Sequence, residues 1–91
     1  MKTILCYGDS NTWGYNPNWK AERKAYWRYD WEDRWPGVLQ ARLGDETRVI
    51  EEGFGGRTLG VDDPVAPFRN GRTYFQMLLE SHQPLSVVAI M

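Results

Sequence analysis

Two short glycine-containing loops hold the residues of this sequence that could carry out a reaction. The first, residues 8–12 (Gly-Asp-Ser-Asn-Thr), follows an apolar run and places Ser10 at the tip of a turn. A serine hydroxyl can attack a carbonyl carbon when a base accepts its proton. In the second loop, residues 53–58 (Gly-Phe-Gly-Gly-Arg-Thr), Gly56 could bring a backbone N–H close to the resulting oxyanion. The pair of loops predicts acyl transfer, with Ser10 as nucleophile and the N–H groups of Ser10 and Gly56 as oxyanion donors.

The second loop does not fit the two common phosphate-binding templates. A dinucleotide fingerprint that begins at Gly53 requires glycine at position 58, where the sequence has Thr58. A P-loop requires glycine at position 51 and lysine at position 57, where the sequence has Glu51 and Arg57. The loop is therefore not predicted to bind a nucleotide.

Several other residues near these loops allow more than one interpretation. Trp13 could form a wall of an acyl pocket or simply pack against its neighbours. Asp9 is expected to order the turn through backbone contacts. Arg57 could steady the second loop, which we favour, or contact a polar group of a substrate. Glu51 and Glu52 cannot act as a glycosidase pair because adjacent residues of a strand face opposite sides.

The elements that must position these loops alternate between strands and helices. Apolar runs predict strands over residues 3–7, 47–52 and 85–91. A helix is predicted over residues 35–43, where Pro36 suits the first turn and Gly44 the C-cap. A second helix is predicted from the capping residue Asn70 to about His82. This β-α-β-α-β order predicts a parallel sheet with helices on both faces, whose carboxyl-end edge brings the two loops together.

Each predicted helix has an apolar face that should point toward the sheet. In the first helix this face comprises Trp35, Val38, Leu39 and Leu43, and in the second Tyr74, Met77, Leu78 and Ser81. His82, the only histidine, closes the second helix and is placed at the amino-end edge of the sheet. A five-residue strand rises roughly 16 Å, so His82 is not expected to reach Ser10.

Residues 13–35 contain all five tryptophans and show neither a strand period nor a helix period. They are predicted to form a long excursion with about one helical turn. The spacing of Trp27, Trp31 and Trp35 fits one packed or interfacial face, or a set of rings that stacks on sugars or bases. The mixed charges between Lys20 and Arg34 are expected to be solvated.

Length and composition place the chain among small globular domains. Its 91 residues, 42% hydrophobic and 25% charged, suffice for one modest core. A net charge of −1 gives no reason to expect nucleic acid or an anionic membrane as partner, and no segment is long and apolar enough to span a bilayer. The single cysteine, Cys6, is expected to be a buried, inert thiol, and a cytoplasmic location is expected.

The two loops and their flanking residues resemble a known family. Residues 4–14 (Ile-Leu-Cys-Tyr-Gly-Asp-Ser-Asn-Thr-Trp-Gly) resemble the first block of the SGNH hydrolases, also called GDSL esterases, in their arylesterase and acyltransferase branch. Residues 49–58 resemble the second block of that branch, and the loop containing Asp62, Asp63 and Asn70 is also similar. The resemblance implies a flavodoxin-like, doubly wound sheet, here with three strands in the order 2-1-3. It implies a serine esterase that needs no metal or organic cofactor and acts on a small acyl-ester substrate.

By this resemblance Ser10 matches the nucleophile and Gly56 the second oxyanion donor. The family's asparagine block and its Asp-x-x-His block have no counterpart in residues 1–91. The uncovered edge of the last strand agrees with an incomplete domain. We therefore expect residues 1–91 to correspond to the first two-fifths of one such domain, with little or no turnover alone. A homo-oligomer or a complementing C-terminal segment is the expected partner. The alternatives are a non-catalytic binding module or one half of a two-chain assembly.

Overall fold

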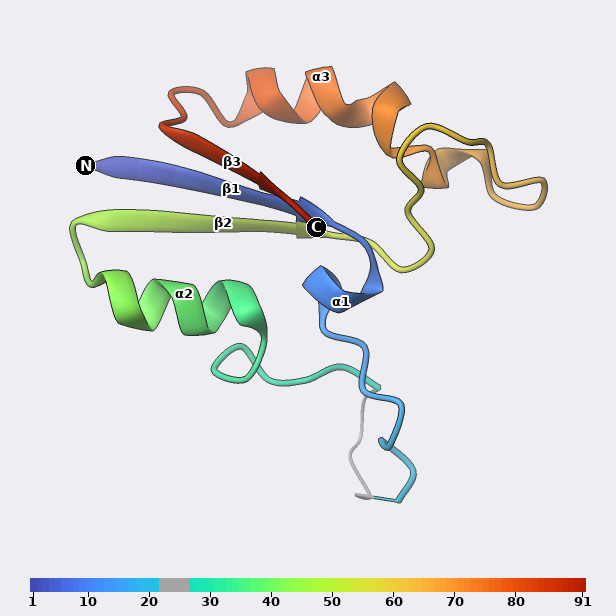
Figure 1. Cartoon of the computed structure of the whole chain (residues 1–91), viewed down its shortest axis with the longest axis horizontal. Coiled ribbons are helices and arrows are strands. Elements are labelled where there is room, and N and C mark those ends of the chain that lie inside the picture. Colours follow the sequence, from blue (N-terminus) through green and yellow to red (C-terminus); the bar gives the residue numbers. More distant parts are fainter. Residues whose placement is uncertain (22–26) are drawn as a thin grey trace.

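The computed structural model describes residues 1–21 and 27–91, which form a three-stranded parallel sheet with helices on both sides (Figure 1). The strand order is β2-β1-β3, as predicted. The elements, in chain order, are β1 (Lys2–Gly8), α1 (Ser10–Trp13), α2 (Trp35–Leu43), β2 (Thr47–Gly53), the 3₁₀ helix η1 (Pro67–Arg69), α3 (Gly71–Ser81) and β3 (Val87–Ile90).

The central strand β1 forms the core because it has a partner on each side. It pairs with β2 from Lys2–Thr47 to Gly8–Gly53, and with β3 from Ile4–Val87 to Tyr7–Ile90. Leu5 and Cys6 are completely buried. The strand predicted over residues 85–91 is shorter than expected, since only four of its residues join the ladder.

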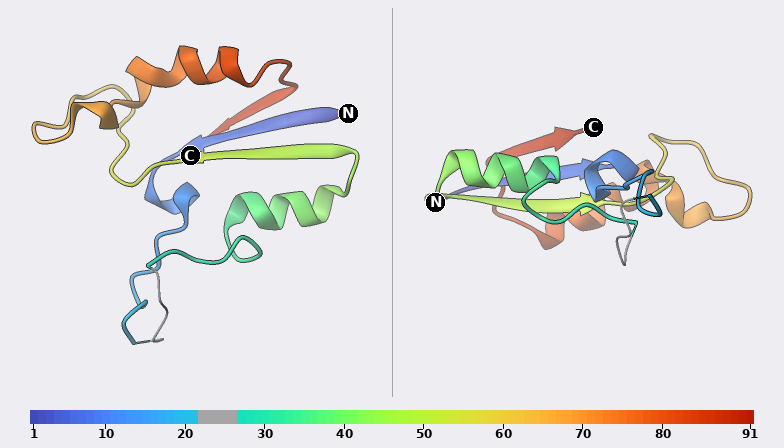
Figure 2. Two further views of the ribbon diagram at one scale, coloured as in Figure 1. Left: turned by 180° about the vertical axis from the view of Figure 1, so that it is seen from behind. Right: turned by 90° about the horizontal axis from the view of Figure 1, so that it is seen from below.

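Helices α2 and α3 lie on opposite sides of the sheet (Figures 1 and 2). The predicted bounds of α2 are confirmed, with Pro36 in its first turn and Gly44 at its C-cap with φ +77°. Its predicted apolar face is only partly covered, because Val38 and Leu43 are exposed. The helix is buried instead at its first turn, at Pro36 and Gly37, where a Cβ on Gly37 would overlap the carbonyl of Trp31.

Helix α3 begins where it was predicted, but it presents a different face to the sheet. The Asn70 side chain accepts hydrogen bonds from the backbone N–H groups of Arg72 and Thr73, which confirms the predicted cap. The predicted inward residues Tyr74 and Met77 are exposed. The half-buried face comprises Phe75, Leu78, Leu79 and His82, and the ring of Phe75 lies 4.9 Å from that of Tyr7. The prediction was wrong because the Tyr7 hydroxyl, which donates to the carbonyl of Gly71, fixes the rotation of the helix.

The described part of the excursion is held by backbone pairing and contains no α-helix in residues 14–21 or 27–34. Tyr15 and Arg28 form an isolated antiparallel bridge, and the N–H of Tyr29 donates to the carbonyl of Gly14. Trp27, Trp31 and Trp35 therefore do not share a helical face. The part of the predicted excursion at residues 22–26 lies outside the described residues.

The charged residues of the excursion are not all solvated, contrary to expectation. The side chain of Arg34 is only 12% exposed and that of Arg28 is 32% exposed. Both guanidinium groups pair with the carboxylate of Glu51 in β2. None of the helices in the two described ranges is long and apolar enough to cross a membrane.

Candidate active site

Ser10 is the first residue of a one-turn helix that begins directly after the central strand. Asp9 is its N-cap: the carboxylate accepts a hydrogen bond of 3.0 Å from the N–H of Asn11, and the carbonyl accepts from Thr12 and Trp13. These contacts confirm the turn-ordering role predicted for Asp9. Irregular turn structure was predicted for these residues. They form a helix instead, and it places Ser10 just beyond the carboxyl-end edge of the sheet.

Two glycines allow α1 to lie directly on the strand ends. A Cβ on Gly8 would lie 2.1 Å from the Thr12 hydroxyl, and a Cβ on Gly53 would lie 2.2 Å from the backbone nitrogen of Trp13. Thr12 is completely buried and accepts a hydrogen bond from the indole of Trp35 at the start of α2. The sequence marked Gly8 and Gly53 only as turn residues, but the structure shows that they set the height of the helix that carries Ser10.

The loop after β2 turns back beside the end of β1. The N–H of Phe54 donates to the carbonyl of Gly8, and the N–H of Arg57 donates to the carbonyl of Phe54. Gly56 lies within this turn with φ +81°, a backbone conformation that favours glycine. Among the described residues, the N–H groups of Ser10 and Gly56 have no hydrogen-bond acceptor, and the Ser10 hydroxyl has no partner. These are the groups that an acyl-transfer site needs to leave available for a substrate.

Arg57 connects the ends of the two strands that carry these loops. Its guanidinium donates to the carbonyls of Gly8 and Glu52 and stacks on the ring of Tyr7, with 4.1 Å from the guanidinium carbon to the ring centroid. The donors directed at these carbonyls support the structural role that the sequence favoured for Arg57.

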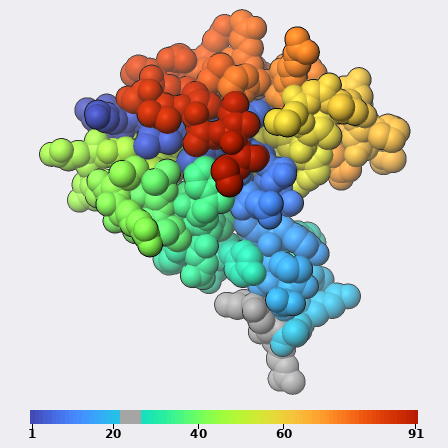
Figure 3. Space-filling view, in the orientation of Figure 1, coloured from blue at the N-terminus to red at the C-terminus, as the bar shows by residue number. Residues whose placement is uncertain are grey.

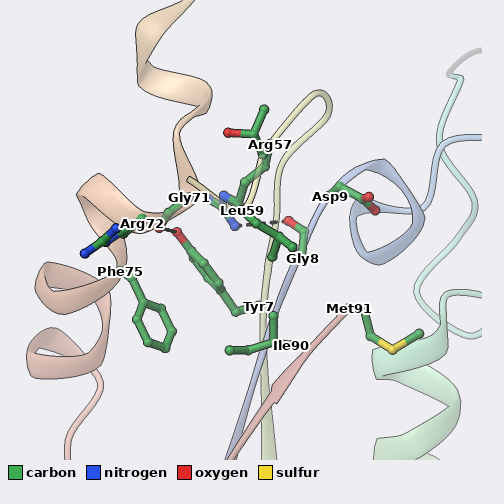
Figure 4. A pocket seen from close by; sticks show the side chains of 11 residues that line it. Tyr7, Gly8, Asp9, Arg57, Leu59, Gly71, Arg72, Phe75, Ile90 and Met91 are labelled. Atoms are coloured by element: carbon green, nitrogen blue, oxygen red, sulfur yellow. Dashed lines mark hydrogen bonds between the residues drawn. The ribbon is translucent and has the colours of Figure 1, made fainter. Parts of the chain in front are cut away.

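A pocket of about 300 Å³ opens at the carboxyl-end edge on the α3 side (Figure 4). Its polar boundary is formed by Asp9, Arg57 and Arg72, and its apolar boundary by residues that include Leu59 and Phe75. The segments around residues 10, 57 and 91 meet on the face seen in Figure 3. Ser10, Trp13 and Gly56 do not line this pocket.

Tyr7 forms the base of the pocket and is only 5% exposed. Burial raises the pKa of its phenol, an effect that the Arg57 guanidinium opposes and the Glu52 carboxylate reinforces. The hydroxyl therefore stays protonated at neutral pH and continues to donate to Gly71. Its role is to anchor α3 rather than to act as a base.

Trp13 lies on the α2 side of the sheet, in a network centred on Glu51. The Arg28 guanidinium stacks on Trp13 at 4.6 Å and donates to its carbonyl and to Glu51. Arg34 donates to both carboxylate oxygens of Glu51, at 3.0 and 2.6 Å. Burial lowers the pKa of Arg28, and the nearby charge of Arg34 lowers it further while Glu51 opposes the shift. The network fastens the end of α1 to β2.

His82 is held on the opposite side of the sheet from α1. Its Nε2 lies 3.1 Å from a carboxylate oxygen of Glu52, which points away from Glu51 as the strand alternation predicted. The sequence did not predict this partner, since it joins two residues 30 positions apart. The pairing occupies His82 on the α3 side, away from α1. Because Glu52 is the next-to-last residue of β2, the prediction that His82 lies at the amino-end edge of the sheet was wrong for its side chain, whose ring reaches the carboxyl-end part of the strand. That His82 is not the base for Ser10 stays a prediction.

Cys6 is completely buried in β1, as expected, and its burial together with the Glu51 carboxylate raises the pKa of the thiol to about 11. The thiol is therefore unreactive at neutral pH. Within residues 1–21 and 27–91, no cluster of three or more His, Cys, Asp or Glu side chains could hold a metal ion.

Solved structures of esterases match the whole of this chain. A carbohydrate acetylesterase from Sinorhizobium meliloti is 47% identical, with a TM-score of 0.90, and the chain covers 41% of its length. An aryl esterase from M. smegmatis is 46% identical, with a TM-score of 0.89 and the same coverage. The chain matches no protein-family model and no curated protein sequence. The chain thus spans about two-fifths of the length of the esterases that it resembles, and over that length it shares their fold.

Proposed function

We propose that residues 1–91 carry the nucleophile and two oxyanion donors of a serine ester hydrolase of the arylesterase and acyl-transfer type. The observation that carries the proposal is the placement of Ser10 and Gly56 on neighbouring strand-end loops, with their N–H groups unpaired among the described residues. The similarity to a carbohydrate acetylesterase and an aryl esterase supports it. The proposed substrate is a small acyl ester, and no cofactor takes part.

In the proposed reaction, the Ser10 oxygen attacks the ester carbonyl carbon and gives its proton to a base. The carbonyl oxygen becomes an oxyanion, which accepts hydrogen bonds from the N–H groups of Ser10 and Gly56. The tetrahedral intermediate collapses, the alcohol leaves with a proton, and an acyl group remains on Ser10. Attack by water, or by another alcohol, then releases the acyl group and restores the hydroxyl.

The base is proposed to come from a segment outside residues 1–91, because His82 is engaged with Glu52 on the other side of the sheet. A serine without a base is a weak nucleophile, although oxyanion donors alone retain part of the catalytic effect. The 91-residue chain alone is therefore expected to hydrolyse esters at a rate near background.

The test is hydrolysis of p-nitrophenyl acetate by the chain alone and after mixing with a separately produced C-terminal portion of the S. meliloti carbohydrate acetylesterase. We expect activity only in the mixture, and we expect Ser10→Ala to abolish it. Ser81→Ala, which changes an exposed serine at the end of α3, is the matched control and should retain full activity. A mixture whose activity survives Ser10→Ala would disprove the proposal. Activity of the chain alone that depends on Ser10 would instead show that the base lies within residues 1–91.

A further inference from the structure

The turn of the second loop decides where the proposed oxyanion donor points. The N–H of Arg57 donates to the carbonyl of Phe54 at 3.0 Å, which closes a β-turn with Gly55 and Gly56 in its middle. A positive φ at Gly56 (+81°) without one at Gly55 is the pattern of a type II turn. The Gly56 N–H therefore belongs to the central peptide of this turn, between the two glycines.

The central peptide can turn over at little intrinsic cost. A type I turn has the same ends, but its central peptide is rotated by about half a turn, so that the Gly56 N–H would point the other way. Glycine adopts positive and negative φ about equally well, and the two glycines therefore select neither turn. Apart from its chain neighbours, nothing lies within 4 Å of a Cβ placed on Gly55. A contact made elsewhere in the turn must favour the observed conformation.

The side chain of Arg69 makes such a contact with Gly56. A Cβ on Gly56 would lie 2.7 Å from Nε, 2.8 Å from Cδ and 3.1 Å from Cζ of Arg69. The Asp63 carboxylate holds the guanidinium, with 3.2 Å between Oδ2 and Nη1 of Arg69. Asp63 is itself fixed, because its other oxygen accepts hydrogen bonds from the N–H groups of Val65 and Ala66. The Arg69 side chain is thus anchored against the Cα of Gly56.

The residues next to this contact hold both ends of the turn. The N–H of Thr58 donates to the carbonyl of Arg69 at 2.8 Å. The ring of Phe68 meets that of Phe54 edge-on, with 5.8 Å between the centroids. Residues 68 and 69 therefore support the turn at positions 54, 56 and 58.

The contact between Arg69 and Gly56 is made by packing and not by hydrogen bonding. The Arg69 side chain is 38% exposed, yet its Nε is buried and has no hydrogen-bond partner among the described residues. A buried donor without an acceptor is rare in native structures and costs free energy. What this part of the side chain contributes is its volume beside Gly56.

We propose that Arg69 is a positioning residue, whose side chain keeps the turn of residues 54–57 in the type II conformation and so directs the Gly56 N–H toward the oxyanion. The inference rests on the proposed function, in which Gly56 is an oxyanion donor. In the alternative turn, the carbonyl of Gly55 would take the place of that donor. A carbonyl oxygen repels an oxyanion, so the alternative turn would raise the barrier to attack by Ser10.

The first test observes the turn itself, through nuclear Overhauser effects (NOEs) in NMR spectra of the 91-residue chain. In a type II turn the Gly56 N–H lies close to an Hα of Gly55, and in a type I turn it lies close to the Gly55 N–H. We expect the Hα contact to dominate in the unaltered chain, and the contact between the two N–H groups to grow at its expense in Arg69→Ala. Arg69→Met should restore the original pattern, because its Sδ and Cε take the places of Cδ and Nε. Arg42→Ala, which removes an exposed arginine of α2, is the matched control and should keep the pattern.

The second test measures p-nitrophenyl acetate hydrolysis in the mixture with the C-terminal portion of the S. meliloti carbohydrate acetylesterase. Arg69→Ala should lower kcat about tenfold with KM unchanged, since an oxyanion donor acts in the transition state and its complete loss lowers kcat by roughly 100-fold or more. Arg69→Met should recover most of this loss, and Arg42→Ala should retain full activity.

A type I pattern in the unaltered chain would overturn the inference, and so would a pattern that Arg69→Ala leaves unchanged. If Arg69→Ala does not fold, Arg69→Met decides: retention of the type II pattern supports the packing role, and its loss contradicts it. The expected NOE changes without any Ser10-dependent hydrolysis would contradict only the proposed function. Ser10-dependent hydrolysis with an unchanged kcat in Arg69→Ala would contradict only the role of Arg69.

Discussion

The two sides of the sheet are joined to their helices in different ways, and adjacent residues show the contrast. Cys6 and Glu51 face α2, where Glu51 holds two arginines and α1 lies against backbone atoms without space for a side chain. Tyr7 and Glu52 face α3, where Glu52 has one half-buried histidine and a pocket of about 300 Å³ opens beside Tyr7. The α2 side of the sheet is therefore joined to its helices through ion pairs and close backbone contacts, and the α3 side through aromatic contacts and a single Glu–His pair.

The loop that carries Ser10, the proposed nucleophile, packs against the α2 side of the sheet at Gly8 and Gly53. A catalytic serine must be held to within a fraction of an ångström, and close backbone packing together with a charged network provides that rigidity. The second loop is held by the Arg57 guanidinium, which reaches the carbonyls of Gly8 and Glu52, and by backbone hydrogen bonds such as that from Phe54 to Gly8. Removal of the packing on the α2 side should thus cost more stability than an equivalent change elsewhere.

The largest effect is expected for Gly53→Ala. Its Cβ would lie 2.2 Å from the nitrogen of Trp13 and 2.6 Å from the carbonyl carbon of Thr12, so α1 must move away from the sheet. Urea denaturation should show a loss of about 3 kcal/mol or more. Gly55→Ala is the control, because nothing lies within 4 Å of its Cβ position, and its stability should change by less than about 0.5 kcal/mol. Equal stability of the two variants would contradict the close packing of α1.

The next prediction concerns the change of folding stability with pH that arises from the buried thiol of Cys6. Because its pKa rises from 9.0 to about 11 on folding, the native state holds the proton more tightly than the unfolded state. Its contribution to stability is complete below pH 9, declines as the pH rises, and is lost above the native pKa. The loss amounts to about 3 kcal/mol between about pH 8 and about pH 12.

Cys6→Ala is the control for this pH dependence, since it leaves the other titrating groups in place. Its stability should fall less steeply than that of the unaltered chain over the same pH range, when both are measured by urea denaturation. Parallel pH profiles of the two proteins would show that the thiol titrates normally.

The smallest expected effect is the difference in stability loss between variants of the neighbouring residues Glu51 and Glu52. Glu51→Gln leaves Arg28 and Arg34 close together without their shared carboxylate, and should destabilise the fold by about 2 kcal/mol. Glu52→Gln removes only the pairing with His82 and should cost less than about 1 kcal/mol. Thermal unfolding of both variants at neutral pH checks the order, and the reverse order would refute the proposed difference between the two sides.

Much of the fold was predictable because its signals are local. Pro36 and Gly44 bound α2, Asn70 caps α3, and the apolar runs give the strands and their parallel order. The location of Ser10 and Gly56 after neighbouring strands was predictable for the same reason. The inward face of α3 was not, because two possible apolar faces overlap on that helix and a hydroxyl from β1 selects between them.

The sequence by itself determined the three strands, helices α2 and α3, and the pair of loops that could perform acyl transfer, since each depends on neighbouring residues and on a simple period. Only the tertiary structure decided which charges are buried and which glycines are indispensable. Arg28 and Arg34 pair with Glu51 across more than 15 positions, and Gly53 meets Trp13 across 40. Such contacts arise when distant segments pack together, and no local pattern in the chain encodes them.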